Sequence, residues 1–193
     1  MLKRGFKSWS ENIALRYRSE LCLQKIDPLN PISLASHLQI PLITPDNLDN
    51  LSSVAKKILL QDDPSSWSAL TLYKNDKHLI VYNSANAPSR RSNDIMHELS
   101  HIVIGHKPHK VFPFSRLNIM IRDFDSNQED EATCLASTLL LPKDALLNIK
   151  FHNIPEVDAA IKYGVSKALL TMRLNLSGVN YIHQRVKQKY SNE

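Results

Sequence analysis

Residues 93–106, NDIMHELSHIVIGH, place two histidines four residues apart and a glutamate directly after the first of them. On a helix, positions i and i+4 lie on one face, so His97 and His101 can direct both imidazoles at one metal ion. Glu98 projects about 100° further round the helix, where it can accept a proton from a metal-activated water without being a ligand. Because zinc lowers the pKa of its water to about 7, this spacing predicts hydrolytic chemistry at neutral pH.

The pentapeptide H-E-x-x-H arises by chance in roughly 1% of chains of this length and composition, so it does not decide the matter alone. The alternative is a pair of core histidines that hydrogen-bond to the main chain. The motif is surrounded by apolar residues that would bury the helix on nearly every side, namely Met96, Leu99, Ile102, Val103 and Ile104. A buried His-Glu-His face needs a strong common partner, and a cation supplies one.

A third protein ligand must come from another segment. The extended pattern H-E-x-x-H-x-x-G-x-x-H would require glycine and histidine where this chain has Ile104 and Lys107. Gly105 is better interpreted as the residue that ends the helix. His106 and His109 follow that end, so we expect them at the rim of the site or in solvent rather than as ligands.

The stronger candidates for the third ligand are two acids in EDEATCLASTLLLP, residues 129–142. Glu129 and Glu131 lie about 200° apart on a helix, so they cannot share one metal ion. The face of Glu129 continues through small residues that let another helix approach, whereas the face of Glu131 carries bulkier residues suited to the core. Since a zinc–oxygen bond is only about 2 Å long, this difference favours Glu129 as the ligand and gives Glu131 a supporting or packing role.

These two segments together resemble the ImmA/IrrE family of zinc metallo-endopeptidases. HELSH and EDEATCLASTLLLP match the family patterns H-E-x-x-H and E-x-E-A-x-x-x-A-x-x-L-L-x-P. The resemblance covers about residues 10–178 through further matching segments at residues 30–42, 90–91 and 163–178. Ser100 and Thr133 depart from the residues common in the family, but neither change removes a chemical group that the mechanism needs.

The resemblance implies that His97, His101 and Glu129 bind Zn2+ and that Glu98 is the general base. It also implies a zincin-like fold and a narrow range of protein substrates, such as a helix-turn-helix repressor encoded nearby and connected with a mobile element or phage. Because zincins bind substrate as an extended strand along a sheet edge, we expect the substrate beside the hairpin at residues 68–83.

Hydrophobic periodicity along the chain predicts a mostly helical α+β fold with one small antiparallel sheet over the active-site helices. A capping-box pattern at Ser8–Glu11 would begin the first helix, Ser92 or Asn93 would begin the motif helix, and residues 105–126 would form a long loop. Further helices are expected at residues 31–38, 46–60, 127–141, 143–150, 156–163, 166–176 and 180–190. The chain is expected to divide into an N-terminal helical segment, a peptidase domain and a basic C-terminal helical tail, at residues 1–65, 66–178 and 179–193.

Composition excludes several classes of protein. The net charge of +5 gathers at the two ends and leaves the middle of the chain nearly neutral, so we do not expect nucleic acid as the partner. Cys22 and Cys134 form neither a C-x-x-C pair nor a disulfide framework. No apolar stretch approaches the about 20 residues of a membrane span, and the N-terminus lacks the apolar part of a signal peptide. We therefore predict a cytoplasmic protein without a membrane partner.

The sequence also fits two functions other than that of a peptidase. Residues 156–176 have the rhythm of a helix-turn-helix, but the second helix offers DNA only Lys167, Thr171, Arg173 and Asn175. The other rival is a catalytically silent zincin that binds a partner without cutting it.

The sequence does not single out the residue that would stabilise the oxyanion. Four side chains qualify by type, namely Tyr82, Arg90, His106 and His109.

Overall fold

The computed structural model describes residues 2–48, 52–62, 66–74, 77–107, 110–114, 119–123 and 125–191. The strands are β1 (Leu42–Ile43), β2 (Ala69–Lys74), β3 (Lys77–Tyr82), β4 (Lys110–Phe114) and β5 (Ile119–Asp123). The helices are α1 (Phe6–Glu20), α2 (Pro31–His37), α3 (Ser53–Lys57), α4 (Pro88–Ile104), α5 (Ser126–Leu140), α6 (Lys143–Phe151), α7 (Glu156–Tyr163), α8 (Lys167–Leu176) and α9 (Val179–Ser191). A short turn of 3-10 helix at Pro45–Asn47 precedes α3, and a π-helical turn at Ile58–Asp62 follows it.

The strands form one sheet in the order β1-β3-β2-β5-β4. The predicted hairpin is confirmed, because β2 and β3 pair antiparallel in a register that sets Leu70 opposite Val81. The short strand β1 runs parallel to β3, with Leu42 beside Ile80, so the sheet is mixed rather than purely antiparallel. The α+β class predicted from the sequence is confirmed.

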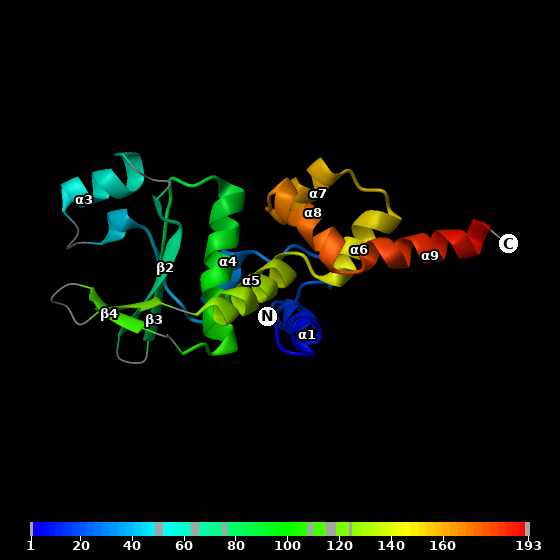
Figure 1. Ribbon diagram of the computed structural model, residues 1–193. Coiled ribbons are helices and arrows are strands. Elements are labelled where there is room, and N and C mark those ends of the chain that lie inside the picture. The colour runs from blue at the N-terminus through cyan, green and yellow to red at the C-terminus, as the bar shows by residue number, and fades with distance from the viewer. Residues whose placement is uncertain are drawn as a thin grey trace.

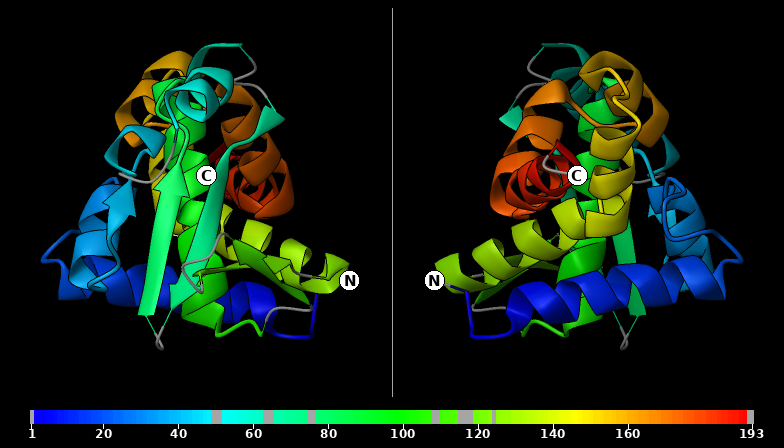
Figure 2. Two further views of the ribbon diagram at one scale, coloured as in Figure 1. Left: turned by 90° about the vertical axis from the view of Figure 1, so that its left-hand side faces the viewer. Right: turned by 90° about the vertical axis from the view of Figure 1, so that its right-hand side faces the viewer.

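The helix that carries the H-E-x-x-H motif, α4, stands between the sheet and the C-terminal helices α6 to α9 (Figure 1). Helix α4 contacts β2 and β3 on one side and α5 on another. Helices α1 and α5 run side by side, as Figure 2 shows in its right-hand view. Leu99 of α4 and Leu135 of α5 are fully buried at the centre of this packing. The positions of α4 and α5 are therefore fixed by the main hydrophobic core.

Helix α1 also holds the C-terminal end of α5 through polar contacts. The buried guanidinium of Arg18 donates hydrogen bonds to the carbonyl oxygens of Leu139 (2.9 Å), Ala14 (3.1 Å) and Asp27 (2.9 Å). Burial lowers the pKa of Arg18 to about 10, although the charges of nearby acidic groups oppose this shift. The bond to Leu139 satisfies a carbonyl in the last turn of α5 that has no partner within the helix.

A second contact from α1 reaches the next helix. One carboxylate oxygen of Glu11 accepts from the Lys143 amide at the start of α6 (2.9 Å), and the other accepts from Arg173 of α8 (2.9 Å). The predicted capping box at Ser8–Glu11 is wrong, because the Glu11 carboxylate makes these contacts instead of capping a helix start. Helix α1 begins earlier, after Gly5, which has a φ of 83° in the left-handed region that favours glycine.

Two further predicted boundaries are wrong. Helix α4 begins at Pro88 rather than at Ser92 or Asn93, because proline's fixed φ suits the first helical position. The expected helix at residues 46–60 is interrupted: residues 45–47 form a separate turn, α3 starts only at Ser53, and residues 49–51 lie outside the described residues.

The segment at residues 105–126, expected as a loop, contains β4 and β5, whose register sets Phe112 opposite Ile121. These strands have only five residues each, and Pro113 interrupts the first, so they show no clear alternation in the sequence. Within the described part of the chain, no helix is long and apolar enough to cross a membrane.

Candidate metal centre

Helix α4 ends at Gly105, directly after the motif residues, and the chain turns sharply there. Gly105 adopts the left-handed conformation, with a φ of 76°, and its amide bonds back to the last turn of the helix. The prediction that Gly105 ends this helix is confirmed. The amide of His106 then bonds to the carbonyl oxygen of His101 (3.1 Å), so the chain turns back along the helix.

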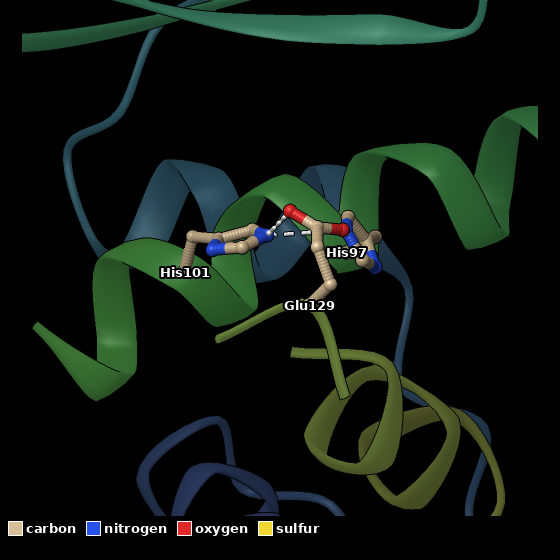
Figure 3. Close-up of side chains that lie close together, drawn as sticks. All are labelled: His97, His101 and Glu129. Carbon is tan, nitrogen blue, oxygen red and sulfur yellow. Dashed lines mark hydrogen bonds and ion pairs between the residues drawn. The ribbon is translucent and has the colours of Figure 1, made fainter. Parts of the chain in front are cut away.

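Three donor atoms from two helices converge at one point (Figure 3). The Nε2 atoms of His97 and His101 lie 3.1 Å apart. The carboxylate of Glu129, in the first turn of α5, has one oxygen 3.1 Å from His97 Nε2 and the other 3.3 Å from His101 Nε2. Two ligand atoms of a tetrahedral zinc site, each about 2.0–2.1 Å from the metal, are roughly 3.3 Å apart. The three donors lie within 4.8 Å of one another and could therefore hold one metal ion.

Exposure differs across the three side chains. His101 is 2% exposed, His97 is 23% exposed and Glu129 is 47% exposed. The cluster is thus anchored in the interior at His101 and open to solvent at Glu129, as a site that must admit a substrate requires. Among the residues that the structure describes, no other His, Cys, Asp or Glu side chains gather in a group of three with this geometry.

Glu98 lies beside this cluster and points toward the sheet. The Thr71 hydroxyl, on the inner face of β2, donates a hydrogen bond to the Glu98 carboxylate (2.5 Å). Burial raises the pKa of Glu98 above its ordinary value, and the bond from Thr71 and the charge of His97 offset only part of that shift. A carboxyl group with a raised pKa is suited to accept a proton and then pass it on.

The polar face of α4 continues toward its N-terminus. Asp94 is one turn before Glu98 and accepts a hydrogen bond from Asn86 (3.3 Å). Burial raises the pKa of Asp94, with Arg90 opposing the shift from 3.8 Å away. Arg90 also donates to the Ser68 hydroxyl at the start of β2 (3.1 Å). Of the four candidates for oxyanion stabilisation, Arg90 shares this face with His97.

The other oxyanion candidates are placed differently. Tyr82 lines a cavity of about 330 Å3 together with Ile95, which lies about 160° round α4 from His97. His109 lies outside the described residues. His106 is 9% exposed and behind His101, so the expectation that it lies at the rim or in solvent is wrong. The reason is the turn at Gly105, which brings the chain back under the helix.

Glu129 and Glu131 occupy separate environments, as their opposite helix faces predict. Glu131 is 2% exposed and its carboxylate accepts from His106 Nε2 (3.1 Å). Lys3 forms an ion pair with the same carboxylate (3.1 Å). Burial alone would raise the pKa of Glu131, but the bonds from His106 and Lys3 lower it below the ordinary value. Glu131 is therefore an ionised, buried group that is connected to the donor His101 through His106.

Sequence reasoning did not single out Thr71, Lys3 or a buried role for His106. Strand alternation could have placed Thr71 on the face toward the motif helix, since its register partner Ile80 belongs to the core. No sequence signal connects Lys3 with the site, because Lys3 and the residue that it contacts, Glu131, are 128 positions apart in the chain.

Comparison with known proteins provides one match. The model of the peptidase M78 family, described as the IrrE N-terminal-like domain, matches residues 56–175. This range contains the whole donor cluster, Glu98 and Thr71, and it is more than half of the chain. No curated protein matches the chain significantly.

Proposed function

Because the chain belongs to the peptidase M78 (IrrE N-terminal-like) family of metallopeptidases, we propose that it is a zinc-dependent endopeptidase with few natural substrates. The ImmA/IrrE resemblance predicted from the two motifs is thereby confirmed. The observation that carries the proposal is the convergence of the His97, His101 and Glu129 donors beside a carboxyl group that is held by the sheet.

In this proposal His97, His101 and Glu129 hold the ion. When bound, zinc supplies a Lewis acid for the scissile carbonyl and makes water acidic enough to lose a proton at neutral pH. Glu98 takes that proton on its carboxylate and later delivers it to the leaving amine. Thr71 keeps the Glu98 carboxylate in one orientation, so the base does not need to reorganise before it acts.

Among the residues that the structure describes, β2 has a short stretch next to this base whose outer side no strand pairs. Strand β5 pairs with β2 at Leu72 and Tyr73, and β1 pairs with the outer side of β3. Because the Asn83 amide bonds to the Ser68 carbonyl, alternation along the ladder directs the main-chain groups of Ala69 and Thr71 away from β3. The substrate strand expected along the hairpin is therefore proposed to bind at Ala69–Thr71.

The proposed substrate is a regulatory protein, such as a helix-turn-helix repressor, which an extended segment of chain would present to this edge. Thr71 and His101 are buried, and only the Glu129 side of the cluster is widely exposed, which favours a flexible segment over a compact surface. We propose a cytoplasmic location for the reaction, where such a repressor acts.

DNA binding through α7 and α8 is less well supported. Arg173, the one arginine of that helix pair, is 7% exposed and donates to the Leu141 carbonyl and to Glu11. It is therefore committed to the core and cannot reach a base edge.

The test is co-expression of the wild type and of Glu98→Gln with candidate repressors, followed by analysis for cleavage. The substitution keeps the shape and a hydrogen-bond acceptor for Thr71 but removes the base. We expect cleavage by the wild type only, with equal zinc content in both purified proteins. Equal cleavage by both would contradict the mechanism, and cleavage by neither, across all repressors tested, would favour the catalytically silent zincin.

A further inference from the structure

Behind the metal donors, a line of buried polar side chains runs from His101 into the protein. The Nδ1 atom of His101 lies 2.9 Å from Nδ1 of His106. His106 in turn contacts the Glu131 carboxylate through Nε2 at 3.1 Å. All three side chains are less than one-tenth exposed. From this line we infer that His106 and Glu131 are positioning residues, which fix the tautomer and the orientation of His101 as a metal ligand.

The donors and acceptors along the line admit one consistent assignment. A carboxylate oxygen accepts, so the Nε2 atom of His106 donates its hydrogen to Glu131. The Nδ1 atom of His106 then accepts the Nδ1 hydrogen of His101, which satisfies both contacts of the line. His101 is thereby left with its lone pair on Nε2, the atom that faces His97 and Glu129. The buried line thus selects the tautomer of His101 that can bind a cation.

The second histidine of the motif lacks this support. Among the residues described, none hydrogen-bonds to Nδ1 of His97, whose side chain is 23% exposed. The two imidazoles therefore differ in support, since His101 has a hydrogen-bond partner at Nδ1 and His97, within the described part of the chain, has none there. A partner that orients a metal-binding histidine typically contributes 10- to 100-fold to metal affinity, so we expect most of this contribution at His101.

The line ends at the surface with Lys3. Its ammonium group is 3.1 Å from Glu131, but the lysine side chain is 80% exposed. An exposed ion pair contributes little because water and salt screen it. We therefore place the positioning effect in His106 and Glu131, and we expect Lys3→Ala to change metal affinity less than threefold.

This inference rests on the proposed metal centre, and its test measures metal binding rather than peptide cleavage. Metal-free protein is titrated with Co2+, whose visible absorption reports the ligands around it. In His106→Phe the ring remains but both hydrogen bonds are lost, so we expect affinity for Co2+ to fall about 10- to 100-fold. In His106→Asn the side-chain oxygen can replace Nδ1 as the acceptor, so part of the affinity should return.

Two controls separate positioning from a general loss of structure. His183→Phe makes the same chemical change in α9, where His183 packs against Phe151, and should leave Co2+ affinity unchanged. The double variant His106→Phe/Glu131→Leu should bind no more weakly than His106→Phe alone, because two residues in one line are not additive. Melting temperatures of the metal-free variants show whether each one is folded.

The possible outcomes are distinct. Wild-type affinity in His106→Phe would overturn the positioning role while leaving the proposed peptidase intact. Additive losses in the double variant would overturn the single line. A folded wild type that binds neither Co2+ nor Zn2+ would overturn the metal centre, and the positioning role with it. If His106→Phe does not fold, His106→Asn and Glu131→Leu decide, and wild-type affinity in Glu131→Leu would overturn the inference.

Discussion

The hydroxyl of Thr71, on the second strand of the sheet, donates a hydrogen bond to the carboxylate of Glu98, on the motif helix. This bond joins the sheet to the residue that we propose as the general base. It is buried, with Thr71 only 3% exposed, so water does not readily replace it. In the proposed mechanism the sheet therefore acts in two ways. Thr71 holds the general base, and the edge of β2 binds the substrate.

We predict that Thr71→Val lowers kcat about tenfold and changes KM little. A hydrogen bond to a charged group contributes about 1.5–3 kcal/mol, and here its loss frees the base to rotate away from the water. Steady-state kinetics on a cleaved partner protein would measure both constants. Thr71→Ser keeps the hydroxyl and should restore most of kcat, whereas wild-type kcat in Thr71→Val would argue against the role of this bond.

We predict that Glu129→Ala loses zinc and activity, whereas Glu131→Ala retains zinc with about tenfold weaker affinity. Glu129 places an oxygen within 3.1 Å of a histidine donor, while Glu131 bonds to His106 and Lys3. Metal analysis of the two purified variants is the measurement. Zinc retained by Glu129→Ala and lost by Glu131→Ala would reverse the assignment.

Removal of the metal should lower the melting temperature, and added zinc should restore it. The ion would join His101 on α4 to Glu129 on α5, and a ligand that binds only the folded state stabilises it by RT ln(1 + [L]/Kd). At a free zinc concentration of about 1,000 times Kd this amounts to about 4 kcal/mol. Thermal unfolding of protein stripped by a chelator would show the effect. An unchanged melting temperature, in protein shown to have lost its zinc, would count against a bridging ion.

We predict that Arg18→Met lowers the free energy of unfolding by about 2–4 kcal/mol. The change removes three hydrogen bonds to carbonyl oxygens and leaves the Leu139 carbonyl at the end of α5 without its partner. Arg16→Met is the matched control on the same helix, because the Arg16 side chain is 53% exposed, and it should change stability by less than about 0.5 kcal/mol. Urea unfolding of both variants would measure the difference, and equal stabilities would show that Arg18 does not hold α5.

The sequence alone was sufficient for residues whose geometry is local. His97, Glu98 and His101 follow from the period of a single helix, and the opposite faces of Glu129 and Glu131 follow in the same way. It was not sufficient where position depends on distant parts of the chain. The contact of Thr71 with Glu98 depends on how β2 packs against α4, and the burial of His106 depends on the turn after Gly105.

Strand prediction shows the same limit. The hairpin of β2 and β3 has clear alternation and a polar turn, whereas β4 and β5 gain their structure from pairing with each other and with β2. Short strands of this kind are stabilised by the sheet they join and carry little local signal. Helix starts at Phe6 and Pro88 were misplaced because the polar residues expected as caps serve other contacts or lie inside the helix.

The core between α4 and α5 has a consequence for how the protein acquires its metal. Leu99 and Leu135 are fully buried between the two helices, so the apolar core itself brings the donors on them close together. Because the core places the donors, we expect the ion to enter a site that is already arranged, from the exposed side at Glu129.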